Sequence, residues 1–150
     1  MSGTIVHHVG ILADALGDCE TLGVVSAALG ASSRIRLLGA RCVPEFDCDC
    51  AVYGGGVEGE ALIEVIRPRS GALRRYLDAA LAEGRPNALH HFAIAVDDVD
   101  EAGRRAISAG ARLISPAAAV GVLDWRVNFI HPLSTGVLVE LVEDPRRRSR

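Results

Sequence analysis

The sequence predicts an α+β fold of two βαβββ modules, whose paired curved sheets surround a shared metal-binding cavity. Two observations favour it. First, the halves of the chain look alike: one opens with VHHVGILADAL and closes with ALIEVIRP, the other opens with LHHFAIAVDDV and closes with VLVELVED. Second, each half reads as a strand, a helix and then several strands. Each opening and closing run is apolar and strand-like, and each carries a histidine or a glutamate at a matching place.

The first half begins with an expected strand over residues 4–12. A helix over residues 14–29 follows, because Leu22, Val25 and Leu29 recur at helical spacing and Gly30 can end it. Three further strands are expected over residues 34–43, 47–54 and 60–67. The run Gly54-Gly55-Gly56 predicts a turn between the last two.

The second half repeats this order after a linker, residues 69–87, that carries a short helix over about 70–83. A strand over 88–96 leads to a helix that Asp97 or Asp98 caps and that ends near Ala109. Strands are expected over 111–115, 124–131 and 136–143, and the basic tail that follows is expected to be disordered. We therefore expect one domain over residues 1–150, made of modules at about 4–68 and 88–144.

Composition narrows the function classes. The chain is 49% apolar and 23% charged, as in an ordinary globular protein. It has no apolar run long enough for a membrane span and no signal-peptide pattern at its start, so we expect a cytoplasmic protein. A net charge of −3 and six aromatic residues argue against a nucleic-acid partner.

Four residues are candidate metal ligands: His8, Glu64, His91 and Glu140. Two imidazoles and two carboxylates suit one divalent ion, and cobalt, nickel, zinc, manganese and iron all fit such a set. An unpaired carboxylate in an apolar strand would be costly, and a bound metal removes that cost. Any one of the four could instead be structural, with an arginine as the partner of a glutamate. Their repeated placement favours the metal.

Alternation along the strands distinguishes the two histidines of each pair. His8 shares a face with Gly10, and His91 shares one with Ala93, so both lie on faces of small residues. We expect the neighbouring histidines, His7 and His90, to lie on the opposite faces and not to be ligands. The four cysteines (Cys19, Cys42, Cys48 and Cys50) are expected to be reduced thiols without a role in metal binding.

Several stretches resemble the vicinal oxygen chelate superfamily, and within it most closely the methylmalonyl-CoA epimerases. They are VHHVGI, LHHFAIAVDDVDEA, VNFIHPLSTGVLVELVE and the linker PRSGALRRYLDAALAEG. The resemblance covers almost the whole chain and is most specific in the second half. It implies the paired βαβββ fold and places the family's metal ligands on His8, Glu64, His91 and Glu140.

One segment departs from the epimerase pattern. Residues 41–60 lack its Gln-Gly-Val stretch, and the family's acid/base glutamate falls on Cys50, with Asp49 one residue away. Asp47, Asp49 and Glu45 are then candidate acid/base groups on one side of the substrate carbon, and Glu140 is one on the other. Alternation with Trp125, Val127 and Phe129 suggests that Arg126 and Asn128 face the cavity and bind substrate.

The expected activity is metal-assisted removal of a proton next to a thioester or ketone carbonyl, on an acyl or acyl-CoA-like substrate, in a homodimer. Two alternatives remain open. One is another enzyme on the same site: a glyoxalase-like isomerase, a lyase or a biosynthetic tailoring enzyme. The other is a metal-free small-molecule binding or resistance protein, a type that the superfamily also contains.

Overall fold

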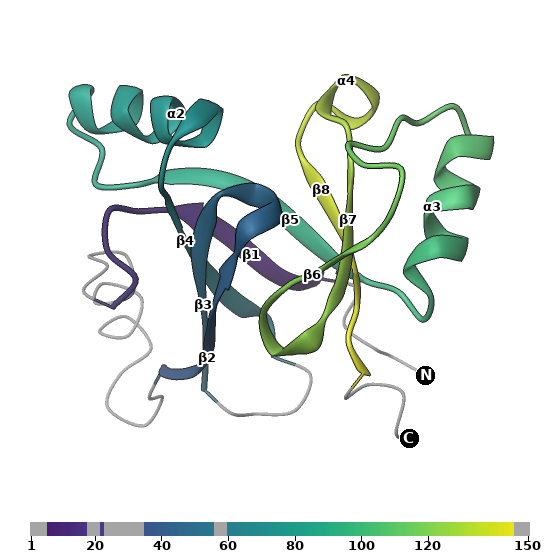
Figure 1. Cartoon of the computed structure of the whole chain (residues 1–150), viewed down its shortest axis with the longest axis horizontal. Helices are drawn as coiled ribbons and strands as arrows, with labels where there is room; N and C mark the ends of the chain where they lie inside the picture. The colour runs from purple at the N-terminus through teal and green to yellow at the C-terminus, as the bar shows by residue number, and fades with distance from the viewer. Residues whose placement is uncertain (1–5, 18–21, 23–34, 56–59, 146–150) are drawn as a thin grey trace.

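The computed structural model describes residues 6–17, 22, 35–55 and 60–145. The elements follow one another in the order of the sequence (Figure 1). The first module and the linker contain β1 (Val6–Leu12), β2 (Arg36–Val43), η1 (Pro44–Phe46), β3 (Cys48–Gly54), β4 (Leu62–Pro68) and α2 (Gly71–Ala82). The second module contains β5 (Ala88–Ala95), α3 (Val99–Ser108), β6 (Ala119–Val120), η2 (Val122–Asp124), β7 (Arg126–Ile130), α4 (Pro132–Thr135) and β8 (Val139–Glu143).

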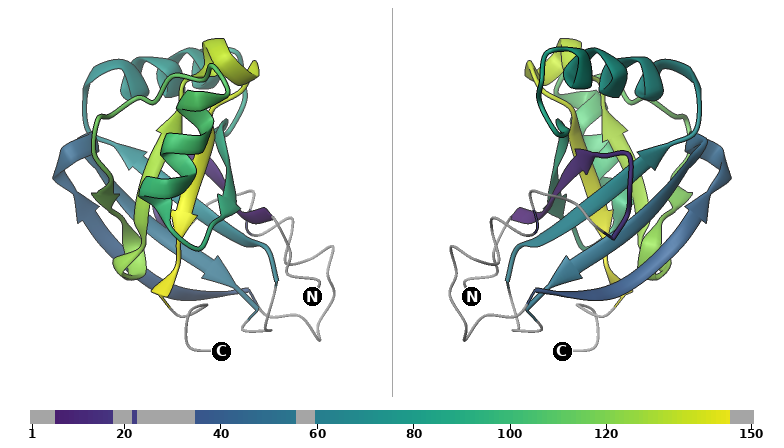
Figure 2. Two further views of the ribbon diagram at one scale, coloured as in Figure 1. Left: turned by 90° about the vertical axis from the view of Figure 1, so that its right-hand side faces the viewer. Right: turned by 90° about the vertical axis from the view of Figure 1, so that its left-hand side faces the viewer.

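The strands form an eight-stranded sheet in the order β2-β3-β4-β1-β5-β8-β7-β6. In each module the opening strand runs parallel to the closing one, β1 with β4 and β5 with β8. The antiparallel pair β1–β5 joins the modules at the centre. The sheet curves strongly around its interior (Figure 2). The predicted α+β class, with paired curved sheets, is confirmed.

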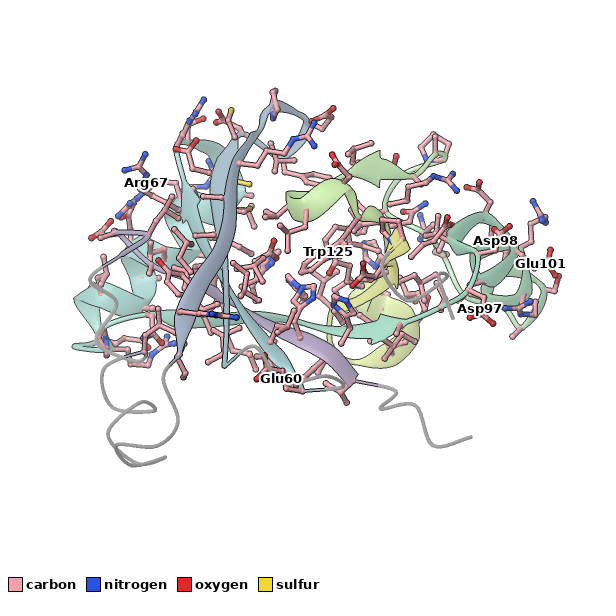
Figure 3. All side chains as sticks on the ribbon, turned by 90° about the horizontal axis from the view of Figure 1, so that it is seen from below. Glu60, Arg67, Asp97, Asp98, Glu101 and Trp125 are labelled. Atoms are coloured by element: carbon pink, nitrogen blue, oxygen red, sulfur yellow. The ribbon has the colours of Figure 1, made fainter. Side chains whose placement is uncertain are left out.

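The main core lies inside this curve. Leu12, Val52 and Val142 are almost completely buried there, because the strands alternate apolar side chains onto the inner face. Leu77 of α2 and Trp125, just before β7, are buried in the same cluster. Figure 3 shows Trp125 among the side chains inside the curve of the sheet, with Arg67 at its periphery.

Helix α3 covers the outer face of the second module, where it contacts β7 and β8. It starts as predicted: the Asp98 side chain accepts a hydrogen bond from the Glu101 backbone N–H at 2.8 Å, which satisfies one free donor of the first turn. Helix α2 contacts β4 and β5, on the side of the molecule away from α3 (Figure 1). None of the described helices is long and apolar enough to span a membrane.

One predicted strand needs correction, and two other predictions lie largely outside the described residues. The strand predicted over 111–115 is reduced to a single bridge between Leu113 and Ile130, and the short β6 pairs with β7 instead. Of the helix predicted over 14–29, residues 14–17 are not helical and Leu22 is helical, and the rest lies outside the described residues. The tail after Pro145 also lies outside them.

Each doubled histidine coincides with an irregularity in the β1–β5 ladder. The register passes from Val6↔Ile94 to His8↔Ala93, and from Gly10↔His91 to Ile11↔Leu89. His7 in β1 and His90 in β5 are therefore the extra residues of two β-bulges, at corresponding places in the modules. A bulge interrupts strict alternation, so neighbouring side chains no longer point to opposite faces.

Candidate metal centre and cavity

The four predicted ligands come together inside the sheet. His8 comes from β1, Glu64 from β4, His91 from β5 and Glu140 from β8, and all four are buried. One ligand atom from each lies within 4.8 Å of the others. The strand pairings explain this convergence, because β4, β1, β5 and β8 are consecutive in the sheet and each ligand faces inward.

The spacing of the ligand atoms fits one metal ion. The Nε2 atoms of His8 and His91 are 2.8 Å apart, and Glu140 Oε2 lies 2.9 Å from the first and 3.3 Å from the second. Glu64 Oε2 lies 3.5 Å from His8 Nε2 and 3.6 Å from His91 Nε2. Ligands bound at roughly 2.0–2.2 Å to one ion lie about 3–3.5 Å from one another.

A second observation supports this fit. Glu140 Oε2 is buried and, among the described residues, has no partner in hydrogen-bond geometry, although His8 Nε2 is only 2.9 Å away. Its close contact with that nitrogen therefore does not satisfy it as a directed hydrogen bond would. A buried carboxylate oxygen left in this state is costly, and a cation between the ligand atoms would satisfy it.

Without a metal, the site holds a proton tightly. Burial lowers the pKa of His8, but the Glu140 and Glu64 carboxylates outweigh burial and raise that pKa to about 10. Burial acts to raise the pKa of Glu140, but His91 and His8 hold it well below its usual range. The metal-free site is thus a buried ion-paired cluster, and an ion must displace the His8 proton to bind.

The bulge residues support the two ligand histidines from behind. His7 Nδ1 lies 2.9 Å from His8 Nδ1, and His7 Nε2 lies 3.3 Å from Asp144 Oδ2. The Trp125 ring packs edge-on against His7 and stacks on His8. In the other module, His90 Nδ1 lies 2.9 Å from His91 Nδ1. In both modules the Nδ1 atom contacts the neighbouring histidine, and Nε2 faces the other ligands.

These contacts correct the expectation that His7 and His90 face away from the ligands. The β-bulges turn each of them toward its neighbour, a feature that alternation along a regular strand cannot predict. His90 also lines the cavity beside His91. Burial, together with the neighbouring His91, lowers the pKa of His90 to about 3, so its ring is neutral at ordinary pH.

A cavity of about 430 Å³ opens onto the ligand cluster, a size typical of small-molecule sites. Glu64, His91 and Glu140 reach its wall. Most of the remaining wall is apolar and comes from both modules, the linker helix and the connecting loops. It consists of Val43, Phe46, Cys48, Cys50, Ile66, Ala72, Leu73, His90, Ile114, Gly121, Val127, Phe129 and Leu138.

The three acidic residues of segment 41–60 that were candidate acid/base groups do not reach the cavity, and two of them bind other side chains. Asp49 lies on the face of β3 away from the cavity, where Arg67 and Arg69 donate to it at 2.7 and 2.5 Å and hold the pKa of its carboxyl below the usual range. Asp47 is exposed in a left-handed turn and accepts a hydrogen bond from Ser70. Glu45 is exposed on η1. The structure brings none of these three to the cavity wall.

Cys50 is on the cavity face, as the alignment with the epimerase pattern suggested. Its sulfur lies 3.6 Å from that of Cys48, which also lines the wall. The hydrogen bond with Cys48, burial and the nearby Glu64 carboxylate all raise the pKa of the Cys50 thiol. Cys50 therefore stays protonated and cannot replace a carboxylate as a base at neutral pH.

The two expected substrate-binding residues point outward. Arg126 donates to Glu143 at 3.0 Å and to Asp100 at 2.6 Å, on the side of the sheet covered by α3. The Asn128 amide donates to the Ser115 carbonyl at 3.2 Å. Their neighbours on β7, Val127 and Phe129, line the cavity instead. Side chains of β7 do alternate between the two faces, but Arg126 and Asn128 lie on the outer face and not, as expected, on the cavity face.

Comparisons with known proteins agree with this fold. A sequence model of the Glyoxalase/Bleomycin resistance protein/Dioxygenase superfamily matches residues 7–129. The chain therefore belongs to this superfamily.

Its similar relatives include methylmalonyl-CoA epimerases. The crystal structure of that enzyme from Mycobacterium tuberculosis superposes with a TM-score of 0.74 at 26% identity, over 100% of this chain and 96% of that one. Methylmalonyl-CoA epimerase from Streptomyces coelicolor, in complex with 2-nitronate-propionyl-CoA, shares the fold with a TM-score of 0.74 at 23% identity, over 96% of this chain and 99% of that one. A mitochondrial methylmalonyl-CoA epimerase of Dictyostelium discoideum is 39% identical over 56 residues, which span 37% of this chain and only 34% of that protein.

Proposed function

We propose that this protein is a metal-dependent isomerase, similar to methylmalonyl-CoA epimerase, that removes a proton next to a thioester or ketone carbonyl. The observation that carries the proposal is the buried set of two histidines and two glutamates at the wall of a largely apolar cavity. A divalent ion held by this set would supply the positive charge that stabilises a developing enolate.

The residues of the chain divide the remaining work. His8 and His91 hold the ion together with Glu64 and Glu140, and the apolar wall excludes water from the reacting carbon. Among the described residues, Glu64 and Glu140 are the carboxylates on that wall. Glu140 accepts the proton in this proposal, because it is one of the two carboxylates that reach the cavity wall. Cys48 and Cys50 also line the cavity, and the raised pKa of the Cys50 thiol keeps it from acting as the base.

Solvent exchange tests this proposal. Metal-loaded protein is incubated in heavy water with one epimer of methylmalonyl-CoA, and separately with the neutral analogue in which a carboxamide replaces the carboxylate. Deuterium uptake at the α-carbon of either compound supports the proposal, and inversion along with uptake indicates two working acid/base groups. Uptake on neither compound above the uncatalysed rate, in protein that holds its metal, overturns it.

Variants connect the exchange to the site. His8→Ala and Glu140→Ala should lose both bound metal, measured by plasma mass spectrometry, and exchange. Asp78→Asn, on the exposed side of α2, serves as the control and should keep both. Exchange that survives in His8→Ala or Glu140→Ala would contradict the role given to the cluster.

A second candidate is a different enzyme on the same centre, such as a glyoxalase-like isomerase, a lyase or a tailoring enzyme. It is favoured by the two carboxylates in the ligand set and by the thiol at the position of the epimerase glutamate. Metal content separates both enzymes from a metal-free binding or resistance protein. A cytoplasmic location and a homodimer stay predictions.

A further inference from the structure

The charge of the cavity wall restricts what can enter it. Among the described residues, Glu64 and Glu140 are the charged side chains that line the cavity, and both belong to the ligand cluster. The described wall contains no lysine or arginine. Its other polar groups are the imidazoles of His90 and His91 and the thiols of Cys48 and Cys50.

The arginines near the cavity are already paired with carboxylates. Arg41 on β2 donates to the carbonyl of the wall residue Gly121 and to Asp124, both at 3.3 Å. Two others, on β4 and β7, are turned outward. Arg67 follows the cavity residue Ile66 on β4 and binds Asp49 on the opposite face. Arg126 precedes Val127 on β7 and binds Glu143 and Asp100. Among the described residues, the cavity wall itself therefore offers a substrate anion no cationic side chain, and the arginine that touches the wall from behind Gly121 is paired with Asp124.

The ligand set does not leave spare positive charge either. Two carboxylates balance the charge of a divalent ion, and neutral imidazoles add none, so the loaded cluster as a whole is neutral. An anionic group in an apolar cavity loses its water shell and needs an opposite charge to compensate. Here that charge is already matched by Glu64 and Glu140.

We propose, on the basis of the function proposed above, that the part of the substrate that enters this cavity is uncharged: a neutral acyl thioester or ketone with apolar substituents, and not a malonyl-type acyl group with a free carboxylate. The carbonyl oxygens provide the polar contacts with the cluster, and the apolar substituent packs against Phe46, Val127 and Phe129. This preference sets the chain apart from relatives whose names specify methylmalonyl-CoA.

A matched pair of ligands tests the preference. The pantetheine thioester of methylmalonate and that of its monoamide have nearly the same shape and differ by one negative charge. Their Kd values are measured by calorimetry on protein loaded with one divalent metal, with metal-free protein as the blank. The monoamide should bind at least tenfold more tightly. Equal or tighter binding of the malonate thioester, or binding of neither at millimolar concentration, overturns the proposal.

A substitution in the cluster tests the physical reason. Glu64→Gln keeps the shape of the side chain and adds one positive charge to the loaded site, so the preference for the monoamide should shrink at least tenfold. Asp78→Asn changes the net charge of the chain equally at an exposed position that does not line the cavity, and should leave the preference unchanged. An unchanged preference in metal-loaded Glu64→Gln contradicts the charge argument. If Glu64→Gln loses its metal, the Kd values of the two thioesters on the unsubstituted protein still decide whether the proposal holds.

The binding measurement tests the substrate class and the exchange measurement tests the reaction, so the two proposals can fail separately. If the monoamide binds more tightly but neither thioester exchanges its α-proton, the substrate class stands and the proposed reaction falls. If the malonate thioester binds more tightly and exchanges, the proposed reaction stands and the substrate class falls.

Discussion

Gly10 lies directly opposite His91 in the β1–β5 ladder, and the imidazole of His91 fills the space that a side chain at position 10 would need. A Cβ atom on Gly10 would lie 2.1 Å from His91 Cε1. Glycine inside a strand weakens it, and a close approach such as this one accounts for its presence. The ligand from one module is thus accommodated by a missing side chain in the other.

Gly10→Ala should therefore push the His91 ring out of the cluster. We expect metal affinity to fall at least tenfold, and overpacking to cost about 1–3 kcal/mol of unfolding free energy. Affinity is measured by competition with a chelator, and stability by urea denaturation of the metal-free protein. Gly17→Ala is the control, since nothing lies within 4 Å of a Cβ there. Unchanged affinity in Gly10→Ala would show that the ring can move without loss of the site.

His7 and His90 should orient the ligands without binding the ion. Partners of this kind fix the orientation of a ligand histidine, and their loss typically weakens metal binding by about 10-fold to 100-fold. In His7→Gln and His90→Gln, plasma mass spectrometry should find the metal stoichiometry of the unsubstituted protein, and chelator competition should find affinity weakened by about tenfold. His7→Gln should show the larger effect, because His7 also contacts Asp144.

His131→Gln is the matched control, because His131 caps α4 away from the cluster. Loss of stoichiometry in a folded His7 or His90 variant would mean that the bulge residue is itself a ligand. Affinity equal to that of the control would mean that the ring contacts do not orient the ligands.

Metal affinity should depend strongly on pH. The His8 pKa rises from 6.5 to about 10 in the metal-free protein, so binding must release this proton. Between about pH 6.5 and 9 the apparent affinity should rise by roughly tenfold per pH unit. Calorimetry in buffers of different ionisation enthalpy should count about one proton released at pH 7.5. A flat affinity over this range would contradict the protonated state of His8.

The same pKa predicts the stability of the metal-free protein. A group whose pKa is raised on folding stabilises the fold fully below its unfolded value, and this contribution is lost as the pH rises through the folded value. For His8 the loss should begin above pH 6.5 and be complete above about pH 10. His8→Gln should remove this part of the pH dependence from urea denaturation curves.

Cys48 and Cys50 should be dispensable for metal binding, although they line the same cavity. Imidazole and carboxylate ligands already complete the set, and the raised pKa of Cys50 disfavours a thiolate ligand. The double substitution to serine should keep the metal stoichiometry and affinity of the unsubstituted protein. A stoichiometric drop would indicate a second site that uses the thiols.

The sequence was most informative where the two modules repeat each other. His8, Glu64, His91 and Glu140 could be predicted because each has a counterpart, and the sheet then brings the four together. Asp49 and Arg126 could not be placed from sequence, because on a single strand either face could be the cavity face. Which face of a strand points inward depends on the residues that pack against it. In the folded protein, Asp49 pairs with Arg67 and Arg126 pairs with Glu143, both on the outer face.

The bulges were not visible in the sequence either. A doubled histidine reads as ordinary alternation, and an extra residue in a ladder is defined only by the partner strand. His7 and His90 therefore seemed to face away from the ligands, whereas the shifted register turns them toward His8 and His91. Likewise, Leu113 makes only one bridge to β7 where a strand was predicted.

The pair β1–β5 is the seam between the modules, and His8 and His91 face each other across it. Each module alone carries one imidazole and one carboxylate, half of a chelate. An ion held by all four would therefore act as a crosslink between two units that are also joined by a ladder, a shared core and a linker. Loss of the ion would weaken the contact between β1 and β5 first. Metal binding and the closed arrangement of the two modules around the cavity are therefore coupled.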